Sequence, residues 1–218
     1  ALWGGSILVK RYGQRPVSPP PPPLTLLEIV LAASSVLINT LITVIGLWFW
    51  RAGWVWFRDD WGMGVLQDVL VLGFSMDFLM YCLHRVAHRP WFYRIIHSTH
   101  HRFDHPRPLT LFVLHPFETF SFGGLWLVVM LLYHSSWVGM SLYLALNVAF
   151  GAIGHLGVEP FPNGWPKLPL LNLLATSTFH AEHHAEEGHN FGFYTLIWDR
   201  LFGTLSPEYQ SSFERLPE

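Results

Sequence analysis

The chain has 218 residues, of which 51% are hydrophobic and only 13% are charged, and 11 of them are tryptophan. This composition excludes an ordinary soluble domain and is typical of a membrane protein, while the length corresponds to a single domain. The formal net charge is −2, and the sequence contains neither a basic stripe nor a nucleic-acid-binding motif, so we expect no nucleic-acid partner.

Cysteine and lysine are both rare. Cys82 is the only cysteine, which excludes an internal disulfide and the multi-cysteine ligand sets of rubredoxins, ferredoxins and zinc fingers. Any electrons that the protein uses must therefore come from another protein. Lysine occurs only at Lys10 and Lys167 while arginine is frequent, a bias that favours a bacterial inner membrane over the endoplasmic reticulum. Residues 2–9 precede their basic neighbours, so they do not predict a cleavable signal.

The first part of the chain ends in a proline-rich segment. Residues 15–23 finish with five consecutive prolines, which cannot form a helix and predict a stiff, extended linker. We therefore expect an N-terminal arm over residues 1–23, a membrane domain over 24–205 and a C-terminal tail over 206–218.

Four apolar runs predict four membrane-spanning helices, because about 20 apolar residues cross a bilayer. The runs cover residues 24–50, 64–83, 109–133 and 137–157. The short connection between the last two makes them an antiparallel hairpin, so the segments before residue 109 and after residue 157 emerge on the same side. Beyond residue 160 we expect a helix over 172–187 and an apolar segment over 194–205 that lies along the membrane surface.

The arginines predict the orientation of these spans. Five arginines lie between the second and third runs and none lies in the hairpin connection, which by the positive-inside rule places the first of these segments in the cytoplasm. Arg51 and Arg58 in the opposite loop argue against this orientation, although two aspartates accompany them.

Histidines occur in three clusters with helical spacing. The clusters are His84-x3-His88, His97-x2-His100-His101 and His180-x2-His183-His184. Residues three or four apart share one face of a helix, so each cluster can aim its imidazoles at one point, and all three clusters are predicted to lie on one side of the membrane. Eight imidazoles are too many for one metal ion, and His155 at the end of the fourth run is the natural ninth ligand.

Two carboxylates accompany the histidines. Asp77 lies in the second span on the same helix face as Tyr81, His84 and His88, and an intramembrane aspartate is functional by default. We expect it to accept the second ring N–H of a ligating histidine, the alternative being a helix–helix hydrogen bond without a metal role. Glu159 lies one helical turn after His155 and is a candidate metal ligand, the alternative being a solvated surface carboxylate.

The other histidines are weaker candidates. His115 and His189 are possible additional ligands, whereas His105 and His134 are predicted to be structural. Nitrogen-rich ligands without a cysteine thiolate favour a pair of iron ions over structural zinc. A pair of iron ions at the end of apolar helices would activate O2 to attack an unactivated C–H bond of a membrane lipid.

The motifs, in this order, resemble those of the fatty acid hydroxylase and sterol desaturase superfamily of membrane di-iron enzymes. The resemblance runs from Asp77 to Thr204 through His84-Arg85-x2-His88, Ile96-His97-Ser98-Thr99-His100-His101, His115-Pro116-x-Glu118, Gly154-His155, Phe179-His180-x2-His183-His184, Asn190-Phe191-Gly192 and Trp198-Asp199-Arg200-Leu201-Phe202-Gly203-Thr204.

This resemblance implies an all-α protein with about four transmembrane helices and a cytoplasmic, histidine-rich helical cap that holds a dinuclear site. It implies two iron ions, O2 as co-substrate, and electrons from cytochrome b5 or a ferredoxin with its NAD(P)H reductase. The implied catalytic and metal-binding residues are His84, His88, His97, His100, His101, His155, His180, His183 and His184, and Asp77 and Asn190 are expected to be cofactor-binding residues. Glu159 is a further expected metal ligand because of its position one turn after His155. Two departures are Glu159, where several members have a histidine, and the lack of a fused cytochrome b5 domain.

The leading function is hydroxylation of a sterol, fatty acyl chain or related lipid, and desaturation by the same kind of site is the nearest alternative. A metal transporter or sensor would place its ligands near the middle of the membrane, whereas these clusters lie beyond the helix ends. A pseudoenzyme is disfavoured because no cluster has lost a histidine. The lipid is expected to enter laterally into a cavity lined by Phe74, Phe78, Phe112, Trp126 and Phe150.

Overall fold

The computed structural model describes residues 2–217, and every regular element within them is a helix. In chain order the elements are α1 Leu2–Arg11, α2 Leu26–Arg51, α3 Met63–Ala87, α4 Pro90–Phe92, η1 Tyr93–His97, α5 Ser98–His101, η2 Pro108–Phe112, α6 Pro116–Leu132, α7 Trp137–Gly154, η3 Trp165–Lys167, η4 Leu171–Leu173, α8 Ser177–Ala185, α9 Ile197–Phe202 and α10 Tyr209–Glu214. The prediction of an all-α protein is confirmed.

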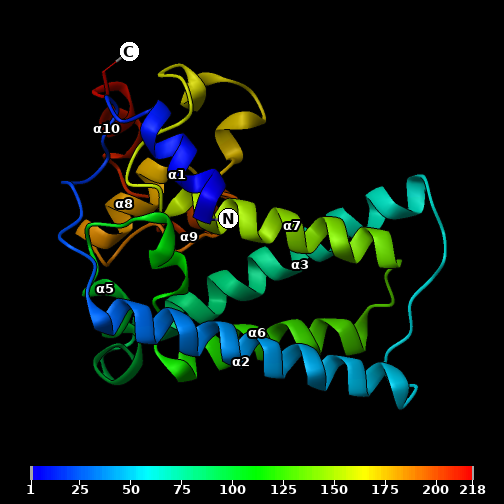
Figure 1. The fold of residues 1–218 in the computed structure, drawn as a ribbon. Coiled ribbons are helices and arrows are strands. Elements are labelled where there is room, and N and C mark those ends of the chain that lie inside the picture. The colour runs from blue at the N-terminus through cyan, green and yellow to red at the C-terminus, as the bar shows by residue number, and fades with distance from the viewer. Residues whose placement is uncertain (1, 218) are drawn as a thin grey trace.

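Helices α2, α3, α6 and α7 run across the view of Figure 1 and form a bundle. Helix α3 packs against α7, α2 packs against α6, and α3 also contacts α6. Among the described helices, α2, α3 and α7 are long and apolar enough to cross a membrane. Helix α6 is apolar but has 17 residues, a length of about 25 Å. The shorter helices gather at one end of the bundle and form a cap (Figure 1).

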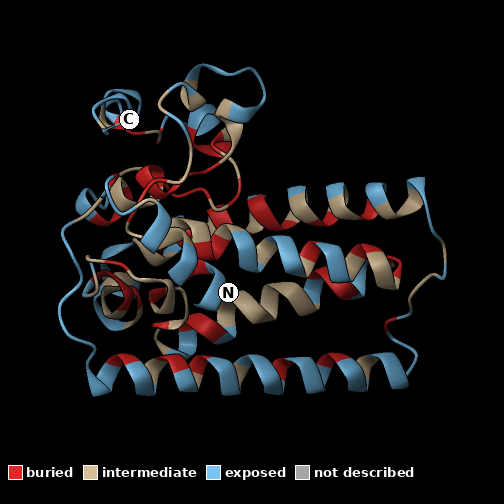
Figure 2. Ribbon diagram, turned by 45° about the horizontal axis from the view of Figure 1, so that its top comes forward, coloured by how far each residue is buried: buried red, intermediate tan, exposed pale blue. Residues whose placement is uncertain are grey.

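The bundle presents apolar side chains to its surroundings. Leu37, Leu41 and Val44 on α2 are 54–60% exposed, and most of this helix is coloured as exposed in Figure 2. Such a surface is stable in contact with lipid tails and unfavourable in contact with water. The buried residues of the bundle lie where the helices face one another.

Helix α2 begins directly after the proline-rich linker, and its first turn is capped. Thr25 accepts a hydrogen bond from the Glu28 backbone N–H at 3.2 Å, and the Glu28 carboxylate accepts from the Thr25 N–H at 2.9 Å. This reciprocal capping box satisfies two N–H groups that the helix leaves unpaired. The other carboxylate oxygen of Glu28 lies 3.3 Å from Arg107, so the start of α2 is attached to the segment that precedes α6.

The third predicted span differs from the observed helix. An α-helix was expected from residue 109, but residues Pro108–Phe112 form a short 3-10 helix and α6 begins only at Pro116. The reason is local: Val113 has a non-helical backbone, and His115 is the N-cap, with its ring accepting from the Phe117 N–H at 3.3 Å. Proline has no N–H to lose at the first helical position, so the helix starts there.

The end of the bundle opposite the cap is held by a buried aspartate. Asp68 on α3 accepts hydrogen bonds from Arg58 at 2.8 Å, from Tyr133 at 2.7 Å and from the backbone N–H and hydroxyl of Ser136 at 2.7 and 2.6 Å. Because these donors come from the connections before α3 and between α6 and α7, one carboxylate joins three helices. This contact fixes the hairpin predicted from the short connection.

The cap contains two departures from the sequence expectations. The helix expected over 172–187 is shorter, because Leu174 pairs with Thr195 in an isolated bridge and Thr176 caps α8 by accepting from the Phe179 N–H. The N-terminal arm also contains a helix, α1, which packs against η2. Gly5 lies so close to Pro108 that an added Cβ would be 2.7 Å from its ring, so only glycine permits this contact.

Candidate metal centre

The structure brings all nine predicted histidines together in two groups at the cap end of the bundle. The five-histidine group consists of His84, His88, His97, His101 and His183, and the four-histidine group consists of His100, His155, His180 and His184. Within each group the candidate ligand atoms lie within 4.8 Å of one another. Each sequence cluster after the first contributes to both groups.

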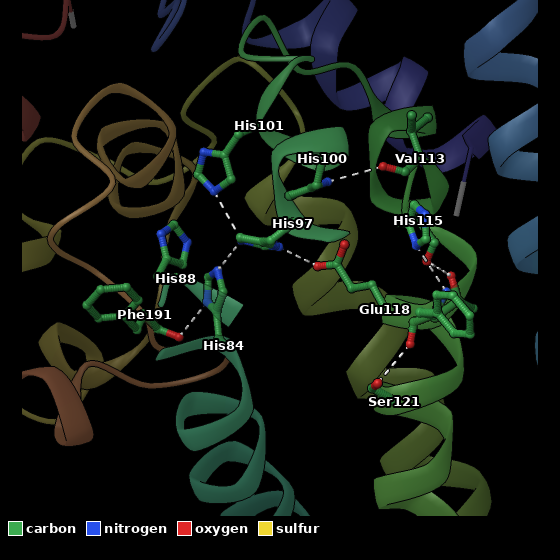
Figure 3. A network of polar contacts seen from close by, with 12 residues as sticks. His84, His88, His97, His100, His101, Val113, His115, Glu118, Ser121 and Phe191 are labelled. Atoms are coloured by element: carbon green, nitrogen blue, oxygen red, sulfur yellow. Dashed lines mark hydrogen bonds and ion pairs between the residues drawn. The ribbon is translucent and has the colours of Figure 1, made fainter. Parts of the chain in front are cut away.

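The local structure explains how the first two clusters meet. Helix α3 extends past the apolar run, so His84 and His88 lie one turn apart at its end. The chain then turns at Pro90 and enters a π-helical turn over Tyr93–His97, a widened turn that is frequent at functional sites. This turn leads into α5, so that the Nε2 atoms of His97 and His101 are 3.1 Å apart (Figure 3).

The remaining ligands come from α7 and α8. His155 is the residue that ends α7, and its Nδ1 donates to the carbonyl of Gly151 at 2.8 Å. Helix α8 begins beside it, and the Ser177 hydroxyl donates to the α7 carbonyl of Ile153 at 2.6 Å. The Nε2 atom of His180 consequently lies 3.0 Å from that of His155.

Backbone carbonyls determine which ring nitrogen carries the proton. Four Nδ1 atoms bond to carbonyl oxygens: His84 to Phe191 at 2.9 Å, His100 to Val113 at 3.3 Å, His155 to Gly151 at 2.8 Å and His183 to His189 at 2.6 Å. A carbonyl oxygen only accepts hydrogen bonds, so each of these Nδ1 atoms is protonated and each Nε2 carries a lone pair. The lone pairs are directed into the two groups.

The spacing of the Nε2 atoms fits a bound cation. Those of His84 and His97 in the five-histidine group are 3.2 Å apart, and those of His100 and His155 in the four-histidine group are 3.4 Å apart. Two unprotonated nitrogens cannot hydrogen-bond to each other, whereas two nitrogens bound at right angles to one metal at about 2.1 Å are about 3 Å apart. The donor set and its geometry therefore fit one metal ion in each group.

Burial keeps these histidines neutral. It lowers the pKa of His100 to about 3 and the pKa of His97 and of His155 to about 4. Neighbouring histidines lower the pKa of His100 further, because two imidazolium ions so close together would repel each other. Neutral imidazole is the form that binds metal, so the site is preorganised for a cation at neutral pH.

Glu118 is the supporting carboxylate of the site. Its Oε1 lies 2.6 Å from Nδ1 of His97, and its other oxygen is buried without a hydrogen-bond partner among the described residues (Figure 3). This contact orients the ring of His97 and makes its Nε2 a better donor to a metal. In the sequence, Glu118 stands out only as part of the motif His115-Pro116-x-Glu118, and its position in the first turn of a span, three residues after His115, is the signal for this role.

Asp77 does not have the predicted role. Its carboxylate accepts from the Tyr194 backbone N–H at 2.8 Å, the Thr195 hydroxyl at 2.5 Å and the Trp198 ring N–H at 3.1 Å, and from no histidine among the described residues. These bonds hold the segment that follows Phe191, and the Phe191 backbone carbonyl accepts from Nδ1 of His84.

Glu159 and Asn190 also act at a distance from the two groups. Glu159 accepts from the backbone N–H and hydroxyl of Thr178 at 2.9 and 2.7 Å and from the Phe161 N–H at 3.2 Å, so both of its oxygens are engaged in positioning the start of α8. The Asn190 amide donates to the Phe179 carbonyl at 3.0 Å and accepts from the Ser206 N–H at 2.7 Å. Neither side chain belongs to a histidine group.

The four remaining histidines lie outside both groups. His115 caps α6, and His189 contributes its backbone carbonyl to His183. His105 lies beside the proline-rich linker, 3.3 Å from the Pro19 carbonyl, and His134 stacks on Trp56 with ring centroids 4.3 Å apart.

A cavity of about 530 Å³ extends from the histidines between α2, α3, α6 and α7. Its inner end is lined by His84, His97, His100, His155 and His180, and its outer end by Trp50, Phe57 and Trp137. Trp137 stacks on Phe57 at 3.8 Å and meets Trp50 edge-on at 5.4 Å between ring centroids. The walls between the two ends are mostly aliphatic and aromatic.

Two of the five residues predicted to line the cavity do so, and three lie elsewhere. Phe112 and Trp126 line the cavity, as expected. Phe74 and Phe78 instead pack on Trp198, with ring centroids 4.9 and 4.7 Å apart. Phe150 lines a separate, small pocket beside His155 and His180.

A helical membrane bundle with nine clustered histidines at one end defines a class of protein, and comparison with known proteins identifies the family. The fatty acid hydroxylase family model matches residues 69–204, so the chain belongs to the fatty acid hydroxylase family. The resemblance inferred from the motifs is therefore confirmed. No solved structure shows a significant match to the chain.

The curated relatives are named for several lipid reactions. The chain is 34% identical over 137 residues to the very-long-chain aldehyde decarbonylase GL1-1 of Oryza sativa subsp. indica, covering 60% of the chain and 22% of that protein. It is 27% identical to the Delta(7)-sterol 5(6)-desaturase of Leptosphaeria maculans, covering 71% and 42%, and 29% identical to the lathosterol oxidase of Rattus norvegicus, covering 72% and 50%. The chain thus spans half or less of the length of these relatives.

Proposed function

We propose that the protein oxidises an unactivated C–H bond of a membrane lipid with O2, using a pair of iron ions held by the two histidine groups. The observation that carries this proposal is the position of both groups at the inner end of a long apolar cavity within a membrane bundle. Membership of the fatty acid hydroxylase family supports iron as the metal and a lipid as the substrate.

The nine histidines would hold the metals, five at one ion and four at the other. The metals, when bound, supply activation of O2. The chain itself supplies the ligand geometry, through the carbonyls that fix the Nδ1 protons and through Glu118, which holds the ring of His97. These contacts keep the Nε2 atoms of five of the nine histidines deprotonated and directed at the metal sites, namely those of His84, His97, His100, His155 and His183.

The cavity would position the substrate and exclude water. An apolar chain loses little free energy on passing from the bilayer into an apolar cavity, since about 0.8 kcal/mol per CH2 is gained in either place. Selectivity must therefore come from the shape of the cavity and from its few polar groups. The packed rings of Trp50, Phe57 and Trp137 at the outer end would limit the length of the chain that fits.

Hydroxylation is the reaction that we favour. One oxygen atom of O2 enters the C–H bond to give an alcohol, and the other leaves as water after taking up two electrons and two protons. The electrons would come from a separate donor, cytochrome b5 or a ferredoxin with its NAD(P)H reductase, because the single cysteine excludes an iron–sulfur cluster within this chain. Desaturation, the reaction in the name of the Leptosphaeria relative, is the second candidate.

The test combines metal analysis with lipid analysis. Purified protein is expected to bind two iron ions per chain, and cells that make it should accumulate a lipid heavier by one oxygen atom, whereas a desaturase would give one lighter by two hydrogen atoms. The product should be absent without O2 and absent in the His84→Ala variant. A protein that binds iron but leaves the lipid extract unchanged, when supplied with an electron donor, would refute lipid oxidation.

A further inference from the structure

Two asparagines interrupt the apolar lining of the cavity. Asn39 on α2 and Asn147 on α7 both line it, and both helices are long and apolar enough to cross a membrane. A polar side chain inside the membrane is costly and usually has a function. Neither residue contributes to the histidine groups, so the metal centre does not explain them.

The contacts of α2 with α6 give the depth of Asn39. The Ser35 hydroxyl lies 2.9 Å from that of Thr119, and further along the bundle Gly46 faces Leu127. Asn39 lies between these two contacts, four residues beyond Ser35, which is about 6 Å along the helix axis.

Thr119 marks the level of the metal centre, because it follows Glu118, which holds His97. Asn39 therefore lies about one helical turn, or 6 Å, below the histidines and toward the middle of the membrane.

Asn147 lies at a similar depth. Its Oδ1 accepts from the Tyr194 hydroxyl at 2.6 Å, and that hydroxyl is also 3.5 Å from the Met80 sulfur. Met80 precedes His84 by four residues on α3, again one turn or about 6 Å. His155 follows Asn147 by eight residues on α7, or about two turns, so both amides line the cavity one to two turns below the histidines.

Both amides have unused hydrogen-bonding capacity. Because the Oδ1 of Asn147 is engaged by Tyr194, its NH2 group is left, and this group makes no hydrogen bond within residues 2–217. The side chain of Asn39 makes none within the same residues. The other small polar groups of the cavity wall are satisfied: the Thr43 hydroxyl donates to a backbone carbonyl of its own helix at 2.8 Å, and the Ser35 hydroxyl is paired.

We propose that Asn39 and Asn147 form a subsite for a hydroxyl group of the lipid substrate, one to two helical turns below the histidines. A hydroxyl oxygen would accept from the NH2 group of Asn147, and its proton would be donated to Oδ1 of Asn39. The apolar remainder would occupy the outer part of the cavity toward Trp50 and Trp137. This inference rests on the proposed function and narrows its substrate class to hydroxylated lipids.

The subsite can be tested by ligand binding. Trp50, Trp126 and Trp137 line the cavity, and a bound brominated ligand quenches tryptophan fluorescence. The probes are 9,10-dibromooctadecan-1-ol, the corresponding 2-ketone and 9,10-dibromooctadecane, added to the purified full chain in detergent micelles. After correction for partition into micelles, the alcohol should bind about five- to thirtyfold more tightly than the hydrocarbon, which is the contribution of one or two neutral hydrogen bonds. The ketone, which cannot donate, should fall between them.

Asn147→Leu and Asn39→Leu should each reduce the ratio of the alcohol affinity to the hydrocarbon affinity toward one. Thr43→Val is the matched control, since it removes a hydroxyl from the same wall that is already bonded, and it should keep the wild-type preference. If Asn147→Leu fails to fold because Tyr194 loses its acceptor, Asn39→Leu decides the question, since its side chain has no bond to lose. An equal preference in the wild type and in Asn39→Leu would overturn the subsite, as would a ketone bound more tightly than the alcohol.

This binding assay requires neither O2 nor an electron donor. A preference that is lost in the asparagine variants, in a protein that oxidises no lipid, would refute the proposed function and leave the subsite intact. Lipid oxidation by a protein without the preference would refute the subsite alone.

Discussion

Nδ1 of His97 lies 2.6 Å from Oε1 of Glu118, and this pair connects the metal centre to the wall of the cavity, which both residues line. His97 comes from the π-helical turn and Glu118 from the first turn of α6. The carboxylate therefore fixes the orientation of one ring of the five-histidine group relative to a membrane helix.

Replacing Glu118 should weaken metal binding without removing a ligand. Glu118→Ala is expected to lower metal affinity or activity about 10- to 100-fold, because the ring of His97 loses the acceptor that orients it. Glu118→Gln keeps an acceptor oxygen and should lose less. Iron content measured after dialysis against a graded chelator checks this order. If the Gln and Ala variants lose metal equally, orientation by hydrogen bonding is not the role of Glu118.

Substitution of a histidine in either group should abolish metal binding and activity, whereas substitution of a histidine outside both groups should not. His84, His88, His100 and His183 are expected to be indispensable, so the Ala variant of any of them should lose metal and activity while the bundle stays folded. His134→Ala is the matched control, since that ring stacks on Trp56 at the opposite end of the bundle. Metal analysis together with circular dichroism separates loss of the site from loss of the fold. Full activity in His84→Ala would contradict the assignment.

The metal-free protein should become less stable as the pH falls. Unfolded histidines titrate near pH 6.5, whereas burial lowers the folded pKa of His100 to about 3 and that of His155 to about 4. Between about pH 6.5 and about pH 4 the unfolded chain binds protons that the folded chain does not, so the free energy of unfolding decreases as the pH is lowered through this window. Above about pH 6.5 these histidines are neutral in both states, so the free energy of unfolding no longer changes with pH on their account. Thermal unfolding of the chelator-treated full chain, measured across this range, should show a falling midpoint; a constant or rising midpoint would be inconsistent with neutral, buried histidines.

Enlarging the cavity should change the product more than the metal content. Phe112→Ala widens the cavity and Trp137→Ala opens its outer end, so both should alter which lipid or which carbon is oxidised, the second in favour of longer chains. Phe74→Ala serves as the control, because that ring packs on Trp198 outside the cavity. Mass spectrometry of the products from a mixture of chain lengths measures the shift. An unchanged profile in both cavity variants, with metal retained, would show that the lipid does not occupy this cavity.

The orientation in the membrane is predicted from arginine distribution alone. The cap and the C-terminal segment should face the cytoplasm, and the loop between α2 and α3 should face the opposite side. In a Cys82→Ser background, single cysteines at Asp59 and Ser211, both exposed, should react with an impermeant thiol reagent from opposite sides. Labelling of both from one side would exclude the proposed topology.

The sequence by itself determined the helical class, three of the spans to within a few residues, and the nine histidines that gather at one end of the bundle. These features are local: an apolar run long enough to cross a membrane forms a helix whatever its partners, and a spacing of three or four places two rings on one helix face. The start of α6 was predicted too early, because the apolar run begins at residue 109 whereas the α-helical backbone begins only at Pro116. A proline at the first helical position was the signal in the sequence for this start.

The tertiary structure alone decided how the histidines divide and what the acidic residues do. His100 and His101 are adjacent in sequence but belong to different groups, because neighbouring side chains on a helix point about 100° apart toward different partners. Asp77 bonds to the segment after Phe191 and Glu118 bonds to His97, pairings between residues 117 and 21 positions apart. No local spacing encodes such contacts, since they depend on how the cap folds over the helix ends, and the same packing determines which aromatic side chains face the cavity and which face Trp198.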